Sequence, residues 1–157
     1  MSIERVKNYL SKFGLSDRVT EFDVSSATVA LAAEALGCEE RVIAKSMAFN
    51  VKGEPVIVVI AGDCKTDNPK FKAQFGTKAV MIKSDELPEL VGHPMGGVCP
   101  FDVNSGVRVY LDNSLKRFEY VYPAAGTANS AVKLTLDELQ TAVGEHFAGW
   151  IDISKMI

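Results

Sequence analysis

Two runs in the first half of the chain carry the hydrophobic pattern of β-strands. In the run 42–51, alternate side chains share one face because successive strand residues point to opposite sides. The face formed by the odd-numbered residues is apolar except for Lys45. After a turn at 52–54, the run 55–61 is apolar on both faces, which is typical of a central strand in a covered sheet. The first run therefore predicts a strand with a single charge on an apolar face.

Helical spacing and capping residues predict helices between further strands. The helical segments are 3–13 closed by Gly14, a segment that starts at Ser26 or Thr28 and ends at Gly37, one opened by Asn68 and Pro69 and ended by Gly76, one from Ser84 to Gly92, and one that starts at a Thr135–Glu138 capping box and runs to about Phe147. The additional strand candidates are 19–22, 79–82, 107–111 with one wet face, 118–122 and 131–134. This interleaving predicts a mixed α/β fold, and with no linker in the sequence we expect one domain over 1–157.

Composition narrows the class of protein. The longest apolar run, 55–61, is far shorter than the roughly 20 residues of a membrane span, and charged residues near the start argue against a secretory signal. The 3 cysteines form no CxxC pair, which favours a reducing cytoplasm and argues against a disulfide framework or zinc cluster. A net charge of −3 does not suggest general affinity for DNA or other nucleic-acid backbones. With 2 histidines and no ligand spacing, we expect no metal, and no motif calls for a cofactor.

Lys45 is the first candidate for chemistry. A lysine is rarely buried without a partner, because removing its charge from water is expensive. Either the strand face opens onto a pocket that uses the ammonium group, or the strand prediction is wrong.

The glycine- and proline-rich segment 92–101 is the second candidate. It holds three glycines and two prolines within 92–100, so its backbone N–H groups can approach a carbonyl oxygen or a phosphate closely. Its spacing matches neither a P-loop nor a dinucleotide fingerprint. From composition alone, a structural loop and a binding loop are equally compatible with it.

Four segments together resemble the YbaK/EbsC family, the editing domain that occurs free-standing and inserted in bacterial prolyl-tRNA synthetases. They are 43–46, 92–101, 125–130 and 134–139. The resemblance implies a mixed, partly barrel-like sheet surrounded by helices. It also implies hydrolysis in trans of aminoacyl-tRNA mischarged with a small amino acid such as Cys, Ala, Ser or Thr, with the tRNA acceptor end as partner. Oligomeric state is not readable from the sequence.

The resemblance also assigns site residues. The lysine matching Lys45 is central to activity in that family, and the loop matching Gly96 to Pro100 lies against the aminoacyl ester. The catalytic candidates are Lys45, Gly96 and Gly97. The substrate-binding candidates are Ser46, Met47, His93, Val98, Cys99, Pro100, Gly126, Thr127 and Asn129.

The chemistry leaves roles open at two positions. We expect Lys45 to act as a charged anchor, with a general-base role as the alternative, and glycine-loop N–H groups to stabilise the oxyanion. Cys99 either lines the pocket or acts as a nucleophile, although no ordered partner for a thiolate is evident beyond His93. Cys99 and Asp102 depart from the family's usual serine or threonine and glycine. They leave room for a binding module with the same pocket and no significant turnover.

Overall fold

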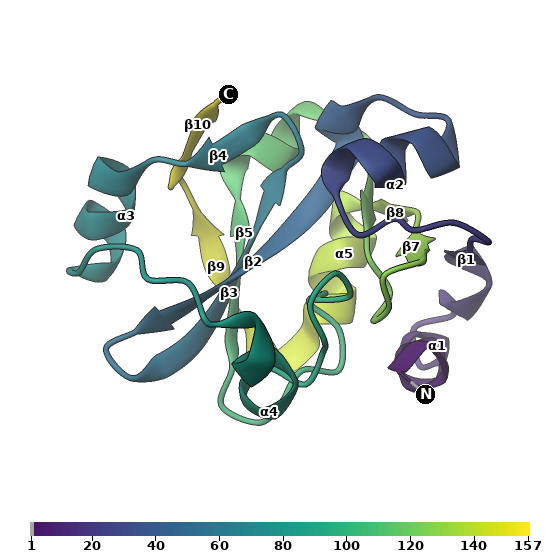
Figure 1. Ribbon diagram of the computed structural model, residues 1–157, viewed down its shortest axis with the longest axis horizontal. Coiled ribbons are helices and arrows are strands. Elements are labelled where there is room, and N and C mark those ends of the chain that lie inside the picture. The colour runs from purple at the N-terminus through teal and green to yellow at the C-terminus, as the bar shows by residue number, and fades with distance from the viewer. Residues whose placement is uncertain (1) are drawn as a thin grey trace.

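The computed structural model, described for residues 2–157, contains a curled mixed sheet of six strands in the order β8-β6-β2-β3-β5-β9 (Figure 1). Its strands are β2 (Ile43–Val51), β3 (Glu54–Ala61), β5 (Arg108–Asp112), β6 (Tyr120–Pro123), β8 (Leu134–Thr135) and β9 (Phe147–Ile151). Two small antiparallel pairs join β1 (Val19–Glu21) to β7 (Ser130–Val132) and β4 (Cys64–Thr66) to β10 (Ser154–Met156). The predicted mixed α/β class is confirmed.

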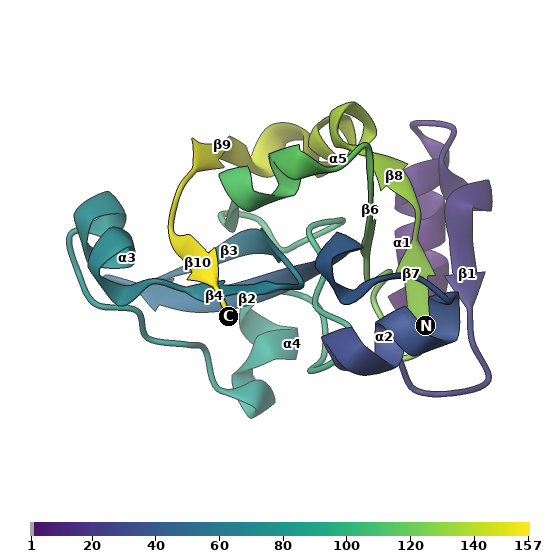
Figure 2. The ribbon, with the colours of Figure 1, turned by 90° about the horizontal axis from the view of Figure 1, so that it is seen from above.

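Five α-helices surround the sheet. They are α1 (Ser2–Ser11), α2 (Val29–Leu36), α3 (Asn68–Phe75), α4 (Leu87–Leu90) and α5 (Leu136–Val143). Figures 1 and 2 place α3 at one end of the molecule and α1 with the β1–β7 pair at the other. Thr28 caps α2, and Thr135 with Glu138 forms the predicted capping box of α5. None of the helices in residues 2–157 is long and apolar enough to cross a bilayer.

Strand β3 lies at the centre of the sheet, and all its residues from Val56 to Ala61 are fully buried. The central, doubly covered strand is therefore confirmed. One of its faces joins the largest core cluster, and the other packs under α3 against Phe71. Tyr110 of β5 lies in this second cluster, with its ring 5.3 Å from that of Phe75. The predicted wet face of β5 is thus wrong at Tyr110, because α3 covers it.

Two other expectations need correction. Residues 79–82 make a single bridge, Met81 with Phe49, because the chain turns away again at Ser84. Helix α5 ends at Val143, where Gly144 adopts a positive φ of 68°, and strand β9 then begins at Phe147. A glycine in that conformation interrupts the helix before its apolar pattern ends.

Two polar segments are also more ordered than their charge indicates. From its charged residues, the stretch 63–67 is expected to be a solvated loop, but it contains strand β4, with Asp63 paired to Arg117 at 2.6 Å and Asp67 capping α3. His146 is expected to be a surface residue late in the last helix, but it is largely buried. Its side chain is 15% exposed, and its Nδ1 lies 2.8 Å from the Val107 carbonyl oxygen.

Candidate active site

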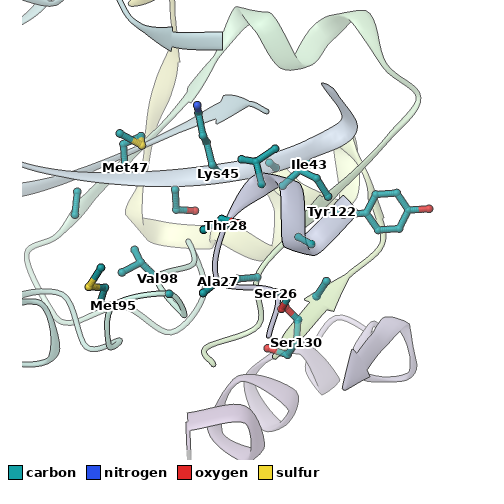
Figure 3. Close-up of a pocket in the computed structure, with 18 of the residues that line it drawn as sticks. Ser26, Ala27, Thr28, Ile43, Lys45, Met47, Met95, Val98, Tyr122 and Ser130 are labelled. Atoms are coloured by element: carbon teal, nitrogen blue, oxygen red, sulfur yellow. The ribbon is translucent and has the colours of Figure 1, made fainter. Parts of the chain in front are cut away.

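A pocket of about 310 Å³ lies between β2, the N-terminus of α2, the 92–101 segment and β7. Its walls are mostly apolar. Of the residues predicted for the site, Lys45, Ser46, Met47, Gly96 and Val98 line it. The structure therefore brings the β2 segment and the glycine-rich loop to one cavity (Figure 3).

The sheet is interrupted at Ser46, where β2 borders the pocket. The N–H of Asn50 donates to Val80 O at 2.8 Å, and Ala48 O accepts from Ile82 N at 3.0 Å. Even-numbered residues of β2 therefore direct their backbone groups away from β3. Strand β6 covers this edge only at Ile43 and Ala44. Within residues 2–157, no strand pairs with the edge at Ser46, so its N–H and C=O face the pocket.

The Ser46 side chain adds a second unsatisfied group. Its Oγ is buried without a hydrogen-bond partner among the described residues. Such a group costs free energy unless a ligand or water satisfies it. Ser46 thus offers a backbone donor, a backbone acceptor and a hydroxyl to whatever occupies the pocket.

Lys45 lies on the other face of β2 from the loop. Figure 3 shows its side chain rising from the strand beside Met47, on the side away from Val98 and Met95. The side chain is half-buried, and this burial lowers the pKa of the amine, while Cys64 and Asp63 oppose part of the effect. Lys45 therefore borders the pocket at β2, and its partly desolvated ammonium group extends on the side of the strand away from the loop (Figure 3).

The glycine-rich loop contains a tight turn. Gly97 N donates to Pro94 O at 3.0 Å, and Gly96 at the corner has a φ of +84°. The Gly97 N–H is therefore occupied by the turn and does not point at a substrate. The described hydrogen bonds leave the N–H groups of Gly96 and Val98 free, and both residues line the pocket.

Gly97 instead makes a close backbone contact. A Cβ at this position would lie 2.6 Å from Gly126 C and 2.7 Å from Thr127 N. Glycine is needed here because the two loops touch backbone to backbone. Gly126 and Thr127 thus support the loop from behind and are not among the pocket-lining residues.

His93 and Cys99 are buried behind the loop. His93 Nε2 lies 2.6 Å from Phe101 O and 3.5 Å from Cys99 Sγ, and both residues have no exposed surface. The ring joins the start of the loop to its end. Burial lowers the pKa of His93 and raises the pKa of Cys99 to about 12. A neutral thiol outside the pocket lining is poorly placed to attack an ester.

Arg5 of α1 contacts both ends of the glycine-rich segment. It donates to Gly92 O at 2.6 Å and pairs with the Asp102 carboxylate at 2.8 Å. Asp102 has a φ of +51°, a conformation that favours glycine and that aspartate tolerates. Both departures from the family pattern, Cys99 and Asp102, therefore lie behind the pocket wall, and Pro100 is also outside the lining.

Asn129 serves the neighbouring loop. Its Nδ2 donates to Phe22 O at 3.1 Å, and its backbone O accepts from Phe22 N at 2.8 Å. It joins the β1 end to the β7 loop and does not line the pocket.

Several pocket residues were not predicted from the sequence. Ser26, Thr28 and Ser130 supply polar groups, and Tyr122 supplies an aromatic ring. Ser26 Oγ lies 3.4 Å from Ser130 O, which joins two segments about a hundred residues apart in the chain. Ser26 and Thr28 had a signal in the sequence as alternative starts of a helix, and Thr28 is the residue that caps it. Ser130 and Tyr122 reach the site through strands β7 and β6.

Comparison with known proteins places this site in a family. A model described as the aminoacyl-tRNA editing domain matches residues 24–142. The chain therefore belongs to the aminoacyl-tRNA editing domain family, and the resemblance to YbaK/EbsC proteins is confirmed.

Individual relatives agree with this assignment. The chain is 45% identical over 156 residues to the uncharacterized protein YwhH of Bacillus subtilis (strain 168), covering 99% of this chain and 98% of that protein. It is 26% identical over 125 residues to a proline–tRNA ligase of Citrifermentans bemidjiense, covering 78% of this chain and 21% of the ligase. A crystal structure of a candidate trans-editing enzyme for prolyl tRNA synthetase has a TM-score of 0.85 and 29% identity, covering 98% of this chain and 97% of that one.

Proposed function

We propose that the chain is a cytoplasmic trans-editing hydrolase that cleaves the ester of aminoacyl-tRNA mischarged with a small amino acid. The family assignment supports editing as the general activity. The observation that carries the proposal is the open strand edge at Ser46, which faces a pocket also lined by Lys45 and the glycine loop. The site needs no cofactor for this reaction.

The pocket suits an aminoacyl group in size and polarity. Its volume of about 310 Å³ is at the lower end of ligand sites, which span roughly 300–1,000 Å³. The Ser46 C=O can accept from the α-ammonium group, and the Ser46 N–H can donate to a carbonyl oxygen. Apolar walls then leave room for a small side chain.

Hydrolysis requires water to add to the ester carbonyl carbon. The bond from that carbon to the ribose oxygen then breaks, and the ribose oxygen takes up a proton as the amino acid leaves. The free N–H groups of Gly96 and Val98 can stabilise the negative charge that develops on the carbonyl oxygen; one such donor contributes about 3–4 kcal/mol in a well-studied protease. Lys45 contributes a positive charge at the strand that borders the pocket.

The role of Lys45 can be read from the pH dependence of turnover. If the protonated amine is the active form, kcat/KM falls as pH rises through the amine's pKa. Because burial lowers that pKa, the fall begins below about pH 10.4, where an ordinary lysine titrates. We expect this alkaline fall in single-turnover rates corrected for spontaneous ester hydrolysis. A rate that instead rises through the same range would identify Lys45 as a general base.

A panel of mischarged tRNAs tests the proposed function. We expect the purified protein to release a small amino acid, Cys, Ala, Ser or Thr, from at least one tRNA. Mischarged proline tRNA is the first substrate to test, because the relatives include a proline–tRNA ligase and a candidate trans-editing enzyme for prolyl tRNA synthetase. Correctly charged tRNAs serve as controls, with released amino acid measured by acid precipitation of labelled tRNA. Binding to aminoacyl-tRNA without release of any amino acid would contradict hydrolysis and identify a binding module.

A further inference from the structure

A shallow groove continues from the pocket along the outside of β6. It has a volume of about 770 Å³ and is lined by residues 37–39 and 42, which follow α2, and by residues 117–120, 122 and 133. Tyr122 lines both the pocket and the groove. Figure 3 shows its ring directed outward from the pocket, so the two cavities meet at this side chain.

Three aromatic side chains line the groove. Tyr120 and Tyr122 alternate along β6 with the fully buried Val121 between them, and Phe118 precedes the strand. Alternate residues of a strand share one face and lie roughly 6.6 Å apart. Tyr120 is 37% exposed, so part of this aromatic side chain is open to solvent.

Cations lie over these rings. Lys133 Nζ is 4.4 Å from the centre of the Tyr120 ring, and Arg117 Cζ is 4.6 Å from that of Phe118. Arg41 approaches Phe118 at 5.8 Å. Aromatic rings interleaved with cations are the surface that single-stranded nucleic acids bind, through base stacking and phosphate contacts.

The charges of the groove are nearly balanced. Arg41 pairs with Glu39, and Arg117 pairs with Asp63. Glu119 is exposed, and Lys133 has no carboxylate partner in the described part of the chain. Affinity on this surface must therefore come mainly from stacking, with Lys133 as the free cation.

The proposed substrate extends beyond the pocket and requires a neighbouring surface that binds RNA. A pocket of about 310 Å³ holds an aminoacyl group, and the RNA to which that group is esterified must continue over the neighbouring surface. The opposite rim carries the exposed side chains of Met81 and Met95. Among the described residues that line the pocket, Tyr122 is the one aromatic side chain, and it marks the side where the groove begins.

We propose that this groove binds the single-stranded 3′ end of the tRNA, with bases stacked on Tyr120 and Tyr122 and a phosphate beside Lys133. The proposal rests on the proposed function, since it follows the RNA that is joined to the hydrolysed ester. It assigns a binding surface to residues that lie outside the pocket.

Binding of an uncharged RNA tests the groove without any hydrolysis. The probe is a fluorescent acceptor-stem hairpin with a four-nucleotide 3′ overhang ending in CCA, measured by anisotropy against the full-length protein. We expect Tyr120→Ala to raise Kd about tenfold, equivalent to about 1.4 kcal/mol, and Tyr120→Phe to stay within about twofold because the ring is kept. Lys133→Ala is expected to weaken binding about threefold and to lower its salt dependence.

Lys12→Ala is the matched control, because Lys12 also lies over a tyrosine ring, that of Tyr9 at 5.3 Å, away from the groove. We expect it to bind like the unchanged protein. Equal binding of a blunt hairpin, or unchanged affinity of Tyr120→Ala, would overturn the proposal. So would a Tyr120→Ala change in oligomeric state by light scattering with RNA affinity unchanged, because the groove would then bind a second copy of the chain.

Different results would contradict the proposed RNA-binding groove and the proposed hydrolase function. If no aminoacyl ester is cleaved but overhang binding still depends on Tyr120, the hydrolase proposal fails and the groove stands. If mischarged tRNA is cleaved equally well by Tyr120→Ala and the unchanged protein at subsaturating substrate, the groove fails and the hydrolase stands.

Discussion

Replacing Lys45 by alanine is expected to lower kcat/KM for the mischarged tRNA by about 100-fold or more. A preorganised charge or donor at a developing oxyanion typically contributes a factor of about 10²–10³ in rate. The amine is half-buried, and burial already disfavours its charged form. Its removal should therefore leave the midpoint of thermal unfolding nearly unchanged, which separates loss of chemistry from loss of fold.

Two lysine variants control this experiment. Lys45→Arg keeps a permanent positive charge and should retain part of the activity if the side chain acts through charge. Lys155→Ala removes an exposed lysine from β10 and should have no effect on turnover. Retention of more than a third of the rate by Lys45→Ala would exclude a catalytic role for this side chain.

Replacing Gly97 by alanine is expected to damage both stability and turnover. The added Cβ would lie 2.6 Å from Gly126 C and 2.7 Å from Thr127 N, which are backbone atoms. Overpacking of this kind costs about 1–3 kcal/mol, and the displaced loop carries the Gly96 and Val98 N–H groups. A shift of about 1 Å at a reacting centre can cost about 100-fold in rate, so we expect a loss of that order, measured with chemical denaturation in parallel.

Gly106→Ala provides a variant of similar stability with an intact pocket. Gly106 has a φ of +86°, and its Cβ would meet nothing within 4 Å. Its cost is the backbone strain of a left-handed residue, about 1–2 kcal/mol, and we expect full turnover. If the two glycine variants lose activity in equal measure, the loop contact at Gly97 has no part in positioning the site.

Local signals in the sequence predicted much of the fold. The apolar run of β3 and the caps at Thr28 and Thr135 are short-range features, and each is found where it was predicted. Strand β9 was missed, because Gly144 ends α5 inside an apolar pattern that continues past it. Burial of Tyr110 was missed because it depends on α3, which packs over β5 from a distant part of the chain.

The site was predictable only in part for the same reason. Lys45 could be identified from its place on an apolar strand face, and the glycine loop from its composition. The open edge at Ser46 depends on where β6 and residue 81 stop pairing with β2, which no local pattern records. Similarly, His93, Cys99 and Gly97 face away from the pocket because of the turn at 94–97 and the contact with Gly126.

The Arg5 contacts link helix α1 to a pocket wall that lies within the shared family region. The shared family region begins at residue 24, yet the guanidinium that fastens both ends of the glycine-rich segment belongs to the helix before it. A fragment cut to the family boundaries would keep every pocket-lining residue. It would lose the Arg5 contacts to the glycine-rich segment that forms one wall. We therefore expect the pocket to keep its shape only when the first helix is present.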